Sequence, residues 1–92
     1  MAMSQYLGKG KIPMISVVIP TYNEERDIGD LLESLAKQTF KNFEVIIVDN
    51  YSNDRTIEIV NRFKGRINIR IYKIKSNVSK ARNFGAEKAR VK

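Results

Sequence analysis

The chain has 92 residues, with 17 Lys and Arg against 10 Asp and Glu, which gives a net charge of +7. It contains no cysteine and no histidine, so disulfides, zinc sites built on those residues and histidine-based catalysis are excluded within it. The length allows one small domain, and the charge favours anionic partners such as phosphorylated ligands, nucleic acid or an acidic membrane surface.

The sequence carries no obvious membrane or export signal. No apolar run approaches the roughly 18 residues needed to span a bilayer, and the N-terminus lacks the apolar core of a signal peptide. We therefore expect a cytoplasmic chain, or one at the cytoplasmic face of the membrane within a longer parent protein. Residues 1–13 show no hydrophobic period and include Lys9 and Lys11. They predict a flexible basic tail before a single domain over residues 14–92.

The first predicted strand is Met14–Ile19 (MISVVI), which is apolar on both faces, as in a buried parallel strand. Pro20 ends it, since proline cannot donate a hydrogen bond to a central ladder. Thr21 and Glu24 have the spacing of a capping box, and Asn23 is a second candidate N-cap. A helical period then runs to about residue 38, with an apolar face of Ile28, Leu31, Leu32 and Leu35.

The second predicted strand, Phe43–Val48, is followed by a polar loop, so the Asp49 carboxylate lies where a buried strand emerges. A second helix is predicted over residues 54–64, with Gly65 as its C-cap. Residues 67–74 alternate apolar and polar side chains, which is typical of an edge strand with one wetter face. Ser79 is a candidate cap for a last helix over residues 80–90, whose small-residue face comprises Ala81, Gly85 and Ala89.

This β-α-β-α-β-α pattern predicts an α/β fold, a Rossmann-like three-layer sandwich with a parallel sheet of order 3-2-1 and right-handed crossovers. In that order the first strand has a free side although its sequence is apolar. We therefore expect the chain to be the front part of a larger sheet. An unpaired apolar strand is also a surface for association, so we expect a homodimer through this edge.

Three loops leave the same edge of the predicted sheet, over residues 20–24, 49–54 and 76–82. They offer carboxylates, amides, hydroxyls and cations, and three helix N-termini, which attract anions, point there. Carboxylates and amides can pair with a base or ribose, and cations with a diphosphate, so the spacing predicts a site for a phosphorylated nucleotide. No GxGxxG follows the first strand and no P-loop motif occurs, which argues against a hydride-transfer domain.

Three blocks of sequence, ISVVIPTYNEE, VIIVDNYSNDRT and SKARNFGAEKA, together resemble the start of family 2 glycosyltransferases, which have the GT-A fold. The blocks occur in the family's order and at suitable separations, and the resemblance covers about residues 15–89. It implies a truncated GT-A domain that binds a nucleotide-diphosphate sugar, linked to UDP, GDP or dTDP.

The resemblance also implies donor-binding roles for seven positions, which are Thr21, Tyr22, Glu24, Asp49, Asn50, Lys80 and Arg82. The first three line the base and ribose, Asp49 recognises the base, and the two basic residues lie near the diphosphate and base. Asn50 stands where many relatives have a second aspartate that can contact the base, which leaves the base identity open. Ser52 and Asp54 match motif residues that shape the loop and the helix start.

The family's next strand carries a DxD-type metal motif, and its catalytic base lies further on; neither occurs in these 92 residues. The resemblance therefore implies no catalytic residue here and no transfer by this chain alone, with Mg or Mn expected only in the full-length enzyme. Structural roles stay open for the site residues: Asp49 could cap the second helix region, and Lys80 and Arg82 could be a solvated helix start.

Two other functions stay open. The charge of +7 would suit a nucleic-acid-binding module, but the basic residues are spread along the chain without the aromatic interleaving of RNA-binding surfaces, so we expect no nucleic acid. The free edge of the first strand would suit a self-associating α/β module without catalysis.

Overall fold

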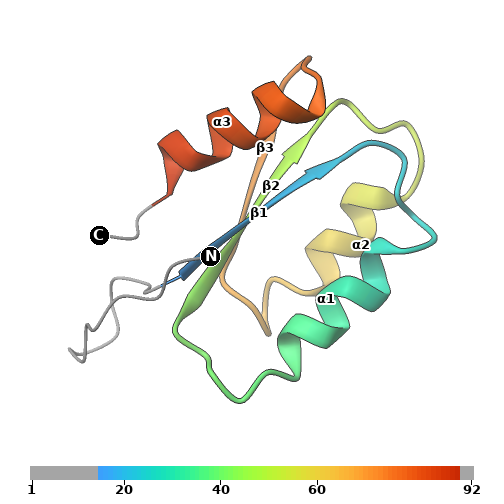
Figure 1. Ribbon diagram of the computed structural model, residues 1–92. Coiled ribbons are helices and arrows are strands. Elements are labelled where there is room, and N and C mark those ends of the chain that lie inside the picture. Colours follow the sequence, from blue (N-terminus) through green and yellow to red (C-terminus); the bar gives the residue numbers. More distant parts are fainter. Residues whose placement is uncertain (1–14, 90–92) are drawn as a thin grey trace.

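A computed structural model describes residues 15–89 of the chain (Figure 1). Strands and helices alternate in the order β1, Ile15–Thr21; α1, Ile28–Ala36; β2, Phe43–Asp49; α2, Thr56–Arg62; β3, Ile69–Lys73; and α3, Val78–Lys88. The predicted tail over residues 1–13 lies outside the described residues. None of the helices within 15–89 is long and apolar enough to cross a membrane.

The three strands form one parallel sheet in the order β1-β2-β3, which confirms the predicted order. The register places Val17 of β1 beside Val45 of β2, and Val45 beside Ile69 of β3. The apolar run of β2 is at most 1% exposed, because β2 is central and both of its faces are covered. Most of β1 is only half-buried, and within residues 15–89 no strand pairs with its outer side.

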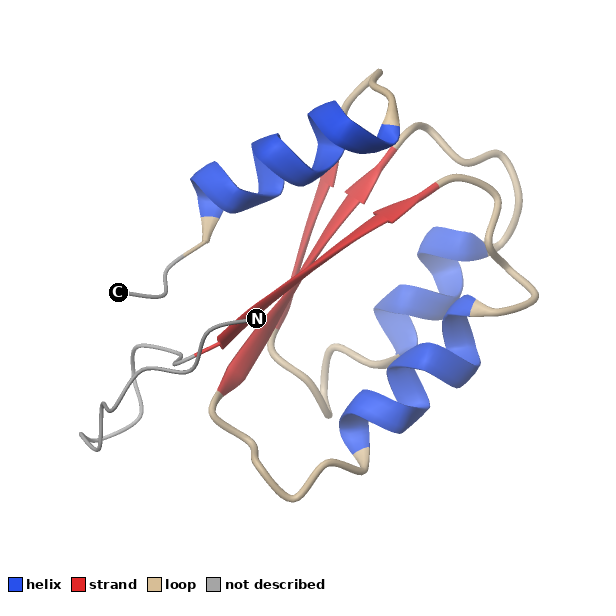
Figure 2. Ribbon diagram, viewed as in Figure 1, coloured by secondary structure: helices blue, strands red, loops and turns tan. Residues whose placement is uncertain are grey.

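Helices cover both faces of the sheet, so the predicted three layers are confirmed (Figure 2). Helices α1 and α2 lie on one face, where Leu32 and Val60 pack against Val45 and Ile47. Helix α3 lies on the other face, where Ala81 packs against Ile46 and Val48 in a smaller cluster. Successive side chains of a strand point to opposite faces, and β2 therefore contributes alternate residues to the two clusters.

The small-residue face predicted for α3 lets it lie directly on β1. A Cβ added at Gly85 would collide with the side chain of Val18, and Ala81 is 4% exposed. Phe84 packs edge-to-face on Tyr72, with ring centroids 5.3 Å apart. These contacts hold α3 close against the sheet.

The predicted starts of the first and last helices were wrong. Helix α1 begins at Ile28 rather than near residue 24, and its N-cap residue, Asp27, makes no side-chain capping bond. Thr21 and Asn23 instead bond to the neighbouring loop. At α3 the cap is Asn77 and not Ser79, since the Asn77 side chain accepts a hydrogen bond of 2.8 Å from the backbone N–H of Lys80.

The C-cap of α2 is Phe63 rather than Gly65, because the chain continues in tight turns that bury Ile67. The predicted wetter face of β3 holds an ion pair that is only partly buried, since its arginine side chain is 21% exposed. Arg70 lies 3.0 Å from Glu44, which is fully buried in β2. The Ser16 hydroxyl donates to the same carboxylate at 2.6 Å, so polar side chains join all three strands beneath α3.

Candidate functional site

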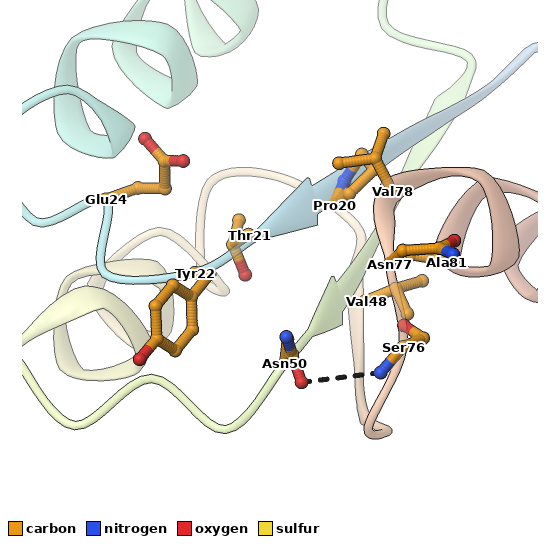
Figure 3. Close-up of a pocket in the computed structure, with 10 residues that line it drawn as sticks. All are labelled: Pro20, Thr21, Tyr22, Glu24, Val48, Asn50, Ser76, Asn77, Val78 and Ala81. Atoms are coloured by element: carbon orange, nitrogen blue, oxygen red, sulfur yellow. Dashed lines mark hydrogen bonds between the residues drawn. The ribbon is translucent and has the colours of Figure 1, made fainter.

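A pocket of about 300 Å³ opens at the carboxyl ends of β1 and β2, beside the N-terminus of α3 (Figure 3). In open α/β sheets this edge is where ligands bind. The lining combines apolar side chains at its back with hydroxyl, amide and carboxylate groups around them: Pro20, Thr21, Tyr22, Glu24, Val48, Asn50, Ser76, Asn77, Val78 and Ala81.

The loops after β1 and β2, residues 22–27 and 50–55, are tied together by reciprocal hydrogen bonds. The backbone N–H of Asn23 donates to the Ser52 hydroxyl at 2.8 Å, and the N–H of Asn53 donates to the Asn23 side chain at 2.9 Å. Asn23 and Tyr51 have φ of 51° and 54°, a left-handed conformation that Asn tolerates well but that is uncommon for Tyr. The two loops therefore form one unit.

A second set of bonds joins the same loops nearer α2. The N–H of Glu25 donates to Asp54 at 3.2 Å, and the N–H of Arg55 donates to Glu25 at 3.0 Å. The Glu24 N–H donates to the Thr56 hydroxyl at 2.7 Å. Partial desolvation of Asp54 opposes its ionisation, but hydrogen bonds from Thr56 and the Glu25 N–H outweigh it, so the pKa of the Asp54 carboxyl lies below its ordinary value.

Asp49 is the centre of this loop unit and is not on the pocket wall. It is fully buried and accepts hydrogen bonds from the Thr21 hydroxyl at 2.6 Å, the Ser52 hydroxyl at 2.6 Å and the Ser52 N–H at 2.8 Å. These three bonds occupy most of the acceptor positions of the carboxylate, and Asp49 is not among the residues that line the pocket. The base contact that the family resemblance implies for Asp49 therefore stays a prediction.

Strand alternation explains why Asn50 lines the pocket and Asp49 does not. Val45 and Ile47 face α1 and α2, so Asp49 continues that face, beside Thr21 in the register. Val48 faces α3, and Asn50 continues the α3 face, where the pocket lies. A difference of one residue therefore separates a buried carboxylate from an amide that lines the pocket.

The structure brings together four of the seven predicted site residues on the pocket wall, which are Thr21, Tyr22, Glu24 and Asn50. Tyr22 is 53% exposed. Asp49 lies behind the wall, and Lys80 and Arg82 are exposed residues in the first half of α3 that do not line the pocket. These two cations nevertheless lie on the helix that borders the pocket.

The sequence reasoning missed Ser76 as a site residue. It lies in the loop between β3 and α3, and its N–H donates to the Asn50 side-chain oxygen at 3.4 Å (Figure 3). Its place in the loop before α3, at the same sheet edge as the other loops, was the signal available. The apolar back wall of Val48 and Ala81 was predicted only as core.

The arrangement suits a flat ring with a hydrogen-bonding edge more than it suits a metal ion. Apolar atoms of Pro20, Val48 and Ala81 lie among neutral amide and hydroxyl groups. Within residues 15–89 no three carboxylates come close enough together to hold a metal ion. The exposed cations of α3 add positive charge on one side, which favours an anionic group there.

Comparison with known proteins identifies the family. Residues 16–92 match the profile of the family described as Glycosyl transferase family 2. Poly(ribitol-phosphate) beta-N-acetylglucosaminyltransferase TarS of Staphylococcus aureus is 40% identical over 79 residues, which cover 80% of this chain and 14% of that protein. Validoxylamine A glucosyltransferase of Streptomyces hygroscopicus is 37% identical over 83 residues, which cover 85% of this chain and 18% of that protein.

Solved structures agree. The crystal structure of S. aureus TarS in complex with UDP has a TM-score of 0.77 and 40% identity, over 84% of this chain and 24% of that chain. Mannosyltransferase PcManGT of Pyrobaculum calidifontis, in complex with GDP-Man and Mn²⁺, has a TM-score of 0.74 and 26% identity, over 85% of this chain and 25% of that chain. The chain spans a quarter or less of the length of these relatives, and it belongs to glycosyl transferase family 2, with the fold of the N-terminal region of a GT-A domain.

Proposed function

We propose that this chain is the donor-binding part of a glycosyltransferase and that it holds the nucleotide of a nucleotide-diphosphate sugar in the pocket between β1, β2 and α3. The observation that carries the proposal is the pocket itself, about 300 Å³ in volume, with Thr21, Tyr22 and Asn50 on one side and the N-terminus of α3 on the other. A base and ribose need amide and hydroxyl partners beside apolar surface, and this wall supplies them.

The charge of the chain favours the same ligand class. Lys80 and Arg82 are exposed on the helix that borders the pocket, and exposed cations attract a diphosphate. The relatives support a nucleotide donor, since TarS structures contain UDP or UDP-GlcNAc and the PcManGT structure contains GDP-Man and Mn²⁺. For this chain the donor is one linked to UDP, GDP or dTDP, with the sugar and acceptor left open.

We also propose that residues 1–92 alone do not transfer sugar. In transfer from a nucleotide donor, a divalent ion usually neutralises the leaving diphosphate, and an acidic residue activates the acceptor hydroxyl. The sequence contains no DxD motif, and the resemblance places both groups further along the family's domain. Mg or Mn would then act only in a full-length enzyme.

Calorimetric titration of the purified chain with UDP, GDP and dTDP tests the proposal. We expect one of them to bind with a micromolar to millimolar dissociation constant. Lys80→Ala should weaken binding about two- to fivefold, the loss of one exposed cation beside a phosphate. The matched control is Lys64→Ala, which removes the same charge from an exposed position after α2 and should leave binding unchanged.

Two outcomes would contradict the proposal. One is that none of the three nucleotides binds. The other is that Lys64→Ala and Lys80→Ala weaken binding equally, which would indicate a response to net charge and not to a site. Release of nucleotide from a sugar donor by the 92-residue chain with Mn²⁺ would contradict the second proposal, that the chain is inactive alone.

Self-association is a second candidate function, favoured by the free side of β1. An edge strand presents unpaired backbone groups that can pair with another strand. The occupant we propose is a second copy of this chain, whose β1 would extend the sheet. This homodimer is compatible with nucleotide binding, because the pocket lies at the carboxyl end of the strands and not along the β1 edge.

A further inference from the structure

The hydroxyl of Ser76 is an unpaired polar group in the pocket wall. Among the described residues, its Oγ is the buried side-chain nitrogen or oxygen atom that has no hydrogen-bond partner. Ser76 nevertheless lines the pocket (Figure 3). Buried hydroxyls in native proteins are normally paired with protein, water or ligand, so an unpaired one in a pocket wall calls for a partner that comes from the pocket.

Asn50 is a second incompletely used polar group on the same wall. Its side-chain oxygen accepts the Ser76 N–H at 3.4 Å, and in Figure 3 its amide nitrogen is turned the other way from that bond. This nitrogen makes no hydrogen bond among those of the described residues. The bond to Ser76 thus orients the Asn50 side chain so that an amide donor remains free.

Building on the proposed function, and on the base contact that the family resemblance implies for the Asn50 position, we propose that Ser76 is a further base-reading residue that forms a polar pair with Asn50. The Asn50 amide donates to an acceptor on the base, and the Ser76 hydroxyl, which can donate or accept, pairs with the neighbouring atom. Rotation about the Ser76 Cα–Cβ bond moves the hydroxyl between staggered positions, so a base against Val48 can recruit it.

The pair explains why the hydroxyl is placed here at all. A water molecule could satisfy it in the free protein, but a ligand that displaces that water gains only if it reproduces the same hydrogen bonds. A nucleobase edge does so, whereas a purely apolar ring does not. Ser76 is therefore a specificity-determining residue, and its contribution should depend on the base rather than on the diphosphate.

The test compares two probes on three proteins. The probes are whichever of UDP, GDP and dTDP binds best, and ribose 5-diphosphate, which has no base. Ser76→Ala should weaken binding of the nucleotide about three- to tenfold, the usual range for one neutral hydrogen bond, and leave binding of ribose 5-diphosphate unchanged. The control Ser79→Ala removes a hydroxyl from an exposed position outside the pocket wall and should change neither.

If Ser76 had only a structural role, Ser76→Ala would weaken binding of both probes equally, and that result would overturn the inference. Unchanged nucleotide binding by Ser76→Ala would overturn it as well. A wild-type measurement keeps the test valid if the variant is unstable: in ¹⁵N-correlated NMR, the Asn50 side-chain amide should shift with the nucleotide and not with ribose 5-diphosphate. Equal shifts would overturn the inference while nucleotide binding, and with it the proposed function, still stood. Failure of the wild type to bind any nucleotide would instead overturn both.

Discussion

Replacing Asp49 by Ala should greatly lower the free energy of unfolding of the chain, and not simply weaken ligand binding. The carboxylate is fully buried and accepts three hydrogen bonds, from the Thr21 hydroxyl and from both the hydroxyl and the N–H of Ser52. Each hydrogen bond to a charged group contributes about 1.5–3 kcal/mol net, and the donors left behind would be unsatisfied. Allowing for relaxation of the loop, we expect a loss of about 3–5 kcal/mol.

That loss is large for a domain of this size, since total stabilities of about 5–15 kcal/mol are typical. Urea unfolding followed by circular dichroism measures it directly. Asp49→Asn should lose less stability, about 1–2 kcal/mol. The amide oxygen can still accept from the Ser52 N–H, and the amide nitrogen can donate to the hydroxyls of Thr21 and Ser52. The control Asp30→Ala removes an exposed carboxylate of α1 and should change stability by less than about 0.5 kcal/mol.

An Asp49→Ala protein with an unchanged urea midpoint but lost nucleotide binding would refute this reasoning. It would show that the carboxylate reads the base, as the family resemblance implies, and that its bonds to Thr21 and Ser52 are dispensable. The two interpretations therefore differ in which quantity the substitution lowers, the free energy of unfolding or the affinity for the nucleotide.

Three further predictions concern packing, pH and association. Gly85→Ala should cost about 1–3 kcal/mol by forcing α3 away from Val18, whereas Gly65→Ala, where an added Cβ meets nothing within 4 Å, should be near neutral in the same urea assay. Because the pKa of Asp54 is lowered in the folded chain from an ordinary 3.8, its contribution to stability is present above that pH and is lost as the pH falls through the lower folded value. Asp54→Asn should therefore flatten the acid limb of the stability curve, and an unchanged limb would contradict the assignment. Sedimentation at rising concentration should show a dimer that Ile15→Lys, at the start of β1, disrupts; a wild-type monomer at high concentration would contradict the proposed pairing of edges.

The sheet order and the layers could be predicted because they follow from patterns that tertiary contacts reinforce. The continuous apolar run of β2 predicts burial on both faces, and the alternation in β3 predicts an edge position; both agree with the structure. The small residues of α3 predict its close packing, and Gly85 lies against Val18. In each case a local property of the side chains is enough to predict the position of the element, and no distant partner has to be known.

The start of α1 could not be predicted, because residues with capping chemistry bonded to distant partners instead. Thr21 donates to Asp49, and the Asn23 side chain accepts from Asn53, so neither caps α1. A local pattern cannot show that a residue about 30 positions away competes for the same hydroxyl or amide. The Arg70–Glu44 pair was missed for the same reason.

The site was only partly predictable, because the loop residues were chosen by their chemical type. The side of the sheet on which each residue lies was not considered. Applying the two-residue period of β2 one step past its end separates Asp49 from Asn50 and assigns only the second to the pocket. Continuing the same two-residue period from Tyr72 and Ile74, which pack on the α3 side, would have included Ser76, whose N–H bonds to Asn50.

The hydrogen bonds also divide the pocket into a rigid side and a more adjustable one. The loops after β1 and β2 are joined by five bonds of 2.7–3.2 Å between residues 23–25 and 52–56. The loop before α3, in contrast, contacts Asn50 through one long bond of 3.4 Å. Preorganised groups bind without an ordering cost, so the first two loops supply a fixed frame for the ligand. Under the proposed function, selectivity among bases would then depend on the third wall, where Ser76 contacts that frame through this single long bond.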